Sequence, residues 1–149
     1  MKTFKLLNIF IIVLCLIPQT LYSQLKKTSE IEKVKSFTNG SIILSKIKIN
    51  EVYIYALTIP NNSKYHEDIV FYLGEEKDVL NNLKDFLHAL NTSKNGDNFD
   101  FTVLSKKYYL SFDAVLGQKC FRIRNEISTS PDFGRLYKAT IIDIIEYLE

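Results

Sequence analysis

The stretch Val70–Leu90 constrains the fold most, because a strand-like run leads there directly into a helix pattern. Val70–Leu73 is typical of a strand, Gly74 predicts a turn, and Glu75–Leu90 predicts a helix. The apolar residues of this helix recur at helical spacing and form one stripe: Val79, Leu80, Leu83, Phe86, Leu87 and Leu90. A lone helix of this length is marginal in water, so the stripe needs a partner surface. The neighbouring strands are the predicted partner.

Runs of alternating or β-branched residues predict strands on both sides of this helix. The predicted strands are Ser41–Ile49, Val52–Ile59, Asp68–Leu73, Asn98–Leu104, Tyr108–Leu116, Lys119–Ile127 and Phe133–Lys138, and a second amphipathic helix is Thr140–Leu148. Both halves thus read as strands followed by a helix. This order favours an α+β fold, an antiparallel β-sheet with two amphipathic helices packed on one face. We expect Leu83 and Phe86 to be among the most buried side chains, packed on Phe71, Phe112 and Ile123.

The N-terminus has the pattern of a secretory signal peptide. A short basic region precedes the apolar run Leu6–Ile17, and a more polar segment ends at Ser23, where we expect cleavage before Gln24. The predicted organisation is a signal peptide (residues 1–23), a polar N-terminal arm (24–38) and a single α+β domain (39–149).

A membrane anchor and a lipoprotein are the two alternatives to cleavage. A membrane anchor needs about 20 apolar residues, whereas the run over residues 6–17 has 12 positions. A lipoprotein needs a small residue before the modified cysteine, whereas Leu14 precedes Cys15. We therefore expect export, to the periplasm or the extracellular space, with no membrane span after cleavage.

Charge and cysteine content exclude several classes of protein. Without Lys2 and Lys5 of the signal peptide, the mature chain has equal numbers of basic and acidic residues, which argues against nucleic-acid binding. Cys120 would be its only cysteine, so no internal disulfide is expected. We expect no cofactor and no metal site, because one cysteine and two histidines make no recognisable ligand set.

A hairpin is predicted at Gly117-Gln118. Glycine at the first central position suits a two-residue type II′ turn, in which Leu116 would face Lys119. In that register Phe112 faces Ile123 and Ala114 faces Phe121, and all four lie on the core side.

The opposite side of this hairpin gathers polar residues. The same register brings Asp113 opposite Arg122 and places Tyr109 and Arg124 on the same face, with Cys120 beside them. A solvated sheet face is one interpretation, and a polar binding face with two arginines is the other. The candidate binding residues are therefore Tyr109, Asp113, Arg122 and Arg124, with a salt bridge expected between Asp113 and one arginine.

The common catalytic motifs are absent from the sequence. The sequence has no nucleophile elbow, P-loop, Rossmann glycine pattern or H-E-x-x-H motif. His66 lies in a predicted loop beside Tyr65, Glu67 and Asp68, where it could act as a general base. An exposed loop without catalytic function is the alternative interpretation.

Several of these segments resemble small secreted proteins of Bacteroidetes-type bacteria. The resemblance lies in the Ser23-Gln24 cleavage pattern and in the segments Ser36–Ile43, Val70–Leu90 and Phe133–Leu148. The chain departs from the group where Gly74 replaces an acidic residue and where Lys106-Lys107 replaces a glycine-rich turn. The group has no assigned activity, so the resemblance implies export and nothing catalytic.

The sequence thus favours an exported, non-enzymatic binding or interaction module of the bacterial envelope. Its partner would be a protein or small-molecule ligand of the envelope, not nucleic acid. A small envelope hydrolase using His66 and its neighbouring carboxylates is the alternative, and a structural or assembly factor of the envelope is a third hypothesis.

Overall fold

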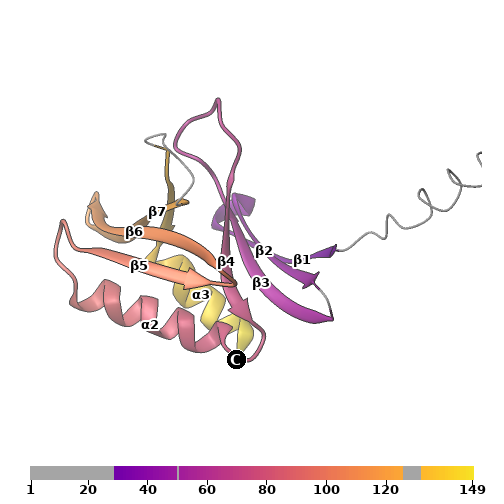
Figure 1. Cartoon of the computed structure of the whole chain (residues 1–149). Helices are drawn as coiled ribbons and strands as arrows, with labels where there is room; N and C mark the ends of the chain where they lie inside the picture. The colour runs from indigo at the N-terminus through magenta and orange to yellow at the C-terminus, as the bar shows by residue number, and fades with distance from the viewer. Residues whose placement is uncertain (1–28, 50, 126–131) are drawn as a thin grey trace, which may run out of the picture.

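The computed structural model describes residues 29–49, 51–125 and 132–149, and the predicted signal peptide lies outside these residues. This part of the chain forms two antiparallel sheets and two α-helices (Figure 1). The elements are β1 (Ser29–Phe37), a short 3-10 turn η2 (Thr38–Gly40), β2 (Ile42–Ile49), β3 (Val52–Ile59), β4 (Ile69–Glu75), α2 (Val79–Thr92), β5 (Asn98–Val103), β6 (Lys106–Val115), β7 (Gln118–Asn125), β8 (Gly134–Tyr137) and α3 (Lys138–Leu148). Strand β1 occupies most of the region where a polar arm was expected, and it pairs with β2.

The strands pair in chain order, β1-β2-β3-β4 in the first sheet and β5-β6-β7-β8 in the second. The α+β class and the antiparallel pairing are confirmed, but two four-stranded sheets replace the single sheet that was expected. The sheets stay separate because the edge of β4 that does not pair with β3 bonds to a side chain of β6 instead of to a further strand. The hydroxyl of Tyr108 accepts a hydrogen bond from the Tyr72 N–H (3.1 Å) and donates one to the Val70 carbonyl (3.3 Å).

One hydrophobic core joins both sheets and both helices. Helix α2 runs alongside β5 and α3 lies behind it (Figure 1). As predicted, Leu83 and Phe86 are buried, with 0% and 7% of their surface exposed. The Phe86 ring lies 5.7 Å from that of Phe71 in β4 and 4.9 Å from that of Phe101 in β5, centroid to centroid, so α2 contacts both sheets.

Helix α2 begins at Val79, four residues after the predicted start, because β4 continues through Glu75. Gly74 lies inside β4 with a φ of +128°, beside an irregularity in the pairing with β3. A Cβ at Gly74 would lie only 2.9 Å from Nδ2 of Asn82, which donates a 2.7 Å hydrogen bond to the Leu73 carbonyl. Glycine is therefore required for close approach of β4 to the helix.

The β6–β7 hairpin has a register two residues away from the predicted one. Leu116 and Gly117 both have positive φ, 51° and 80°, which places them at the centre of a type I′ turn. Val115 therefore pairs with Gln118, and Phe112 faces Phe121 instead of Ile123. A shift of two residues keeps every side chain on its predicted face.

The predicted core side of the hairpin is confirmed with one exception. Phe112, Phe121 and Ile123 are buried, whereas Ala114 is exposed near the end of β6.

The two sheets touch at Gly134, the first residue of β8. Gly134 forms a bridge with Asn61 in the β3–β4 loop, and the Asn62 N–H donates to the Phe133 carbonyl (2.9 Å). A Cβ at Gly134 would lie 2.7 Å from Cγ2 of Ile59, so the backbone of β8 lies directly against a core side chain of β3.

Candidate functional site

The four predicted site residues lie on the outer face of the second sheet but form two separate pairs. Arg122 Nε lies 2.8 Å from Asp113 Oδ2, so the predicted salt bridge forms, although Asp113 is directly opposite Cys120 in the observed register. This hydrogen bond holds the pKa of the Asp113 carboxyl below its usual range. Tyr109 and Arg124 face each other further along the same strands. Tyr109 is 40% exposed.

Cys120 lies on this outer face, yet it is completely buried. In the strand pairing it lies opposite Tyr137 of β8 and opposite Asp113 of β6. Burial raises the pKa of its thiol, and the negative charge of Asp113 acts in the same direction. A reactive thiol needs a lowered pKa and solvent access, so Cys120 is a packing residue.

Strand β8 adds a third arginine that the sequence analysis missed. Arg135 faces Arg122 directly across the β7–β8 ladder. The Phe133 ring contacts both guanidinium groups, with its centroid 5.3 Å from Cζ of Arg122 and 4.8 Å from Cζ of Arg135. Such cation–π contacts hold guanidinium groups in place without neutralising their charge. We name Arg122, Phe133 and Arg135 the arginine stack.

A signal for Arg135 was present in the sequence. In the predicted strand Phe133–Lys138, Gly134 and Leu136 alternate with Phe133, Arg135 and Tyr137. Burial of Leu136 in the core places Arg135 on the same outer face as Arg122 once β8 pairs with β7. That pairing joins distant segments and could not be assigned from periodicity.

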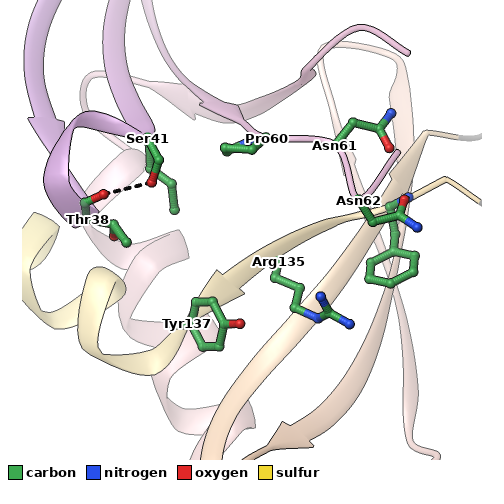
Figure 2. A pocket seen from close by; sticks show the side chains of 9 residues that line it. Thr38, Ser41, Pro60, Asn61, Asn62, Arg135 and Tyr137 are labelled. Atoms are coloured by element: carbon green, nitrogen blue, oxygen red, sulfur yellow. Dashed lines mark hydrogen bonds between the residues drawn. The ribbon is translucent and has the colours of Figure 1, made fainter. Parts of the chain in front are cut away.

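A pocket of about 220 Å³ opens beside the arginine stack, where the two sheets meet. Its lining comes from three segments: the turn after β1 (Thr38, Ser41, Ile42), the β3–β4 loop (Pro60, Asn61, Asn62) and β8 (Phe133, Arg135, Tyr137). Figure 2 shows Arg135 and Tyr137 extending side by side from β8, across the pocket from Pro60 and Asn61.

Local hydrogen bonds hold the pocket walls. Asn61 Oδ1 accepts from the Ser63 N–H (3.0 Å), and its Nδ2 donates to the Glu67 carbonyl (3.0 Å). Asn62 Oδ1 accepts from the Phe133 N–H (2.8 Å), which ties the loop to β8. On the opposite wall the Thr38 hydroxyl bonds to that of Thr140 in α3 (3.1 Å). The pocket is thus formed by segments that are fixed to one another.

The electrostatics of the pocket are determined by Arg135. Its Nε is buried and has no hydrogen-bond partner among the described residues. None of the nine residues described as lining the pocket is acidic. Arg122 is paired with Asp113, whereas Arg135 contributes a positive charge with no counterpart in the lining. A buried guanidinium nitrogen without a hydrogen-bond partner is unusual in a folded protein and calls for an explanation.

The residues of the hydrolase hypothesis are arranged differently from the prediction. His66 Nδ1 contacts the carboxylate of Asp132, which comes from the other half of the chain. Glu67 and Asp68 instead line a second cavity with Lys106 and Lys107. Within the described residues no group of three or more His, Cys, Asp and Glu side chains could hold a metal ion.

Comparison with protein-family models, with curated proteins and with solved structures finds no match for this chain. Within residues 29–49, 51–125 and 132–149, no helix has the length and apolar character that crossing a membrane requires.

Proposed function

We propose that the protein is an exported, non-enzymatic binding module of the bacterial envelope, and that it contacts its partner through the outer face of the second sheet. The observation that carries this proposal is the arginine stack, in which Phe133 contacts both Arg122 and Arg135. Arginine and aromatic side chains are the residue types most enriched at binding hot spots. Export rests on the signal-peptide pattern of residues 1–23.

Burial and charge support a binding role for this face. The side chain of Arg122 is 39% exposed and that of Asp113 16%, so the pair is half-buried and its arginine is the member more open to solvent. Tyr109 adds a half-exposed ring to the same sheet face. A partner that covers this face gains charge-assisted hydrogen bonds from side chains already held in one orientation, which lowers the entropic cost of binding.

Capture from the envelope of the source bacterium tests this proposal. Residues 24–149 serve as bait, and the double substitution Arg122→Glu/Arg124→Glu reverses charge on the proposed face without altering any residue that lines the pocket. We expect partner capture to be lost while the variant stays folded, with a cost in unfolding free energy of about 1 kcal/mol from loss of the Asp113–Arg122 pair.

The matched control is Lys77→Glu/Lys84→Glu, which makes the same charge change at side chains that are 73% and 51% exposed. These lysines lie just before and within α2, away from the proposed face. Equal loss of capture in both double variants, or retention in the arginine variant, would contradict the proposal.

A second candidate is the envelope hydrolase, because the contact of His66 with Asp132 matches the base and orienting carboxylate of a catalytic triad. His66→Ala is the test variant, assayed with ester and peptide substrates in parallel with the unmodified protein. Hydrolysis that disappears in this variant supports the enzyme, and hydrolysis that persists in it removes His66 from the mechanism.

A further inference from the structure

We infer that the pocket beside the arginine stack is a carboxylate-binding site in which the guanidinium group of Arg135 is the anchor. This inference rests on the proposed function and specifies the chemistry of its ligand. The carboxylate would be one group of a larger ligand, whose remainder lies across the outer face of the second sheet.

The hydrogen-bonding groups of the pocket favour an acceptor. Arg135 is donor-only, and its buried Nε has no partner among the described residues. The amide oxygens of Asn61 and Asn62 already accept backbone N–H bonds. The Ser41 hydroxyl donates to the Thr38 carbonyl (2.8 Å). The two amide oxygens are therefore occupied and Nε of Arg135 has no acceptor among the described residues, so an acceptor for this group has to come from a ligand.

The charge balance favours a single negative charge. Arg135 is the only charged residue among those described as lining the pocket, and Arg122, which is paired with Asp113, is not part of this lining. A carboxylate matches one guanidinium group in charge and binds it through two parallel hydrogen bonds. A phosphate dianion would leave excess negative charge with no second cation in the lining. We therefore assign the site to a carboxylate and not to a phosphate.

The size of the pocket limits what it can hold. Pockets that enclose whole small-molecule ligands typically have volumes of about 300–1,000 Å³. The present pocket has about 220 Å³, so it accommodates an anionic group with a few attached atoms. The outer sheet face beside it, with Arg122 and Tyr109, is available for the rest of the ligand.

The experiment is an NMR titration of residues 24–149 with sodium acetate at constant ionic strength, maintained with sodium chloride. The reporters are the side-chain Nε–H signals of Arg135 and Arg124. We expect a saturable shift of the Arg135 signal, while the exposed Arg124 signal moves little. Backbone signals of Thr38 and Asn62 should follow the same binding curve, because both residues line the pocket.

Three variants determine whether the pocket is responsible. Arg135→Gln should weaken acetate binding at least about tenfold, and Arg135→Lys should weaken it to a similar extent because lysine lacks the planar fork. Arg124→Gln makes the same charge change outside the pocket and should leave binding within about twofold. Backbone spectra and thermal melting test whether each variant is folded. If Arg135→Gln is unfolded, the comparison uses Arg135→Lys and the Thr38 and Asn62 signals.

Several outcomes would overturn the inference. They are the absence of a saturable shift with acetate, equal acetate binding in Arg135→Gln, and equal shifts at Arg124 and Arg135. A parallel titration with inorganic phosphate tests the ligand class, and phosphate binding tighter than acetate binding would overturn the carboxylate assignment. The proposed function is tested separately, because its variants change Arg122 and Arg124 while the pocket variants change Arg135.

Discussion

The contact between the sheets at Gly134 gives the most specific prediction of the structure. A methyl group at this position would lie 2.7 Å from Cγ2 and 3.2 Å from Cβ of Ile59. Carbon atoms in a well-packed core are separated by about 3.5–4.0 Å, so β8 and β3 must move apart in Gly134→Ala. Ile59 is completely buried and β-branched, and it has little freedom to turn away.

The expected cost follows from two opposing terms. Overpacking costs roughly 1–3 kcal/mol, and replacing glycine in the unfolded chain returns roughly 0.4–1 kcal/mol. We expect Gly134→Ala to lower the free energy of unfolding by about 1–2 kcal/mol, measured by urea denaturation of residues 24–149 with circular dichroism.

A double-mutant cycle with Ile59→Ala isolates the clash. Ile59→Ala alone should cost roughly 2–5 kcal/mol because it leaves a cavity. In that background the atom 2.7 Å away is absent, so Gly134→Ala should be neutral or slightly stabilising, a coupling of about 1–2 kcal/mol. A neutral Gly134→Ala in the unmodified chain, or an equal cost in both backgrounds, would refute close contact between the sheets.

Four further predictions follow from individual side chains. Leu83→Ala should lower the free energy of unfolding by roughly 2–5 kcal/mol because Leu83 is completely buried, and Leu87→Ala should lower it less because Leu87 is half-buried. If urea denaturation gives a cost below about 0.5 kcal/mol for Leu83→Ala, α2 does not dock as described. Leu116→Asn should stabilise the protein by about 0.5–1 kcal/mol, because Leu116 is 99% exposed with a φ of 51° and asparagine tolerates this backbone conformation. A lower urea midpoint in this variant would contradict the type I′ turn. Burial raises the pKa of Tyr108 to about 12, so this phenol ionises at lower pH in the unfolded chain than in the folded protein, and stability should fall as pH rises from about 10 towards 12. Ultraviolet titration checks the pKa, and the stability of Tyr108→Phe should fall less steeply over the same alkaline range. Arg122 lowers the pKa of Asp113, so the stabilisation from this pair is present above the usual carboxyl pKa of about 3.9 and is lost as pH falls through the lower pKa of the folded protein. The melting temperature of Asp113→Asn should therefore decline less than that of the unmodified protein at acidic pH.

The sequence predicted local features well because they follow from periodicity. The faces of the β6–β7 hairpin are correct even though its register is not, since side-chain alternation determines the face and the turn determines the register. The type I′ turn was missed because it places Leu116 in a left-handed conformation that leucine rarely adopts.

Features that depend on distant segments were not predicted. The separation into two sheets depends on the bonds of Tyr108 to the edge of β4, which cross from one half of the chain to the other. The salt bridge of Asp113 with Arg122 was predicted because it lies within one hairpin. Arg135 and its pocket were not, because three segments far apart in the sequence build that pocket.

The chain-order pairing of the strands has a consequence for how the protein folds. Within each sheet every strand pairs with the next one along the chain, so each ladder forms by closing a short loop. Such local pairing has a small entropic cost and favours rapid formation of hairpins. The contacts that span long sequence distances include those of Tyr108 with β4 and of Gly134 with Ile59. We therefore expect the slow step of folding to be the docking of two partly formed sheets, and substitutions at Tyr108 or Gly134 to alter this step more than the early formation of hairpins.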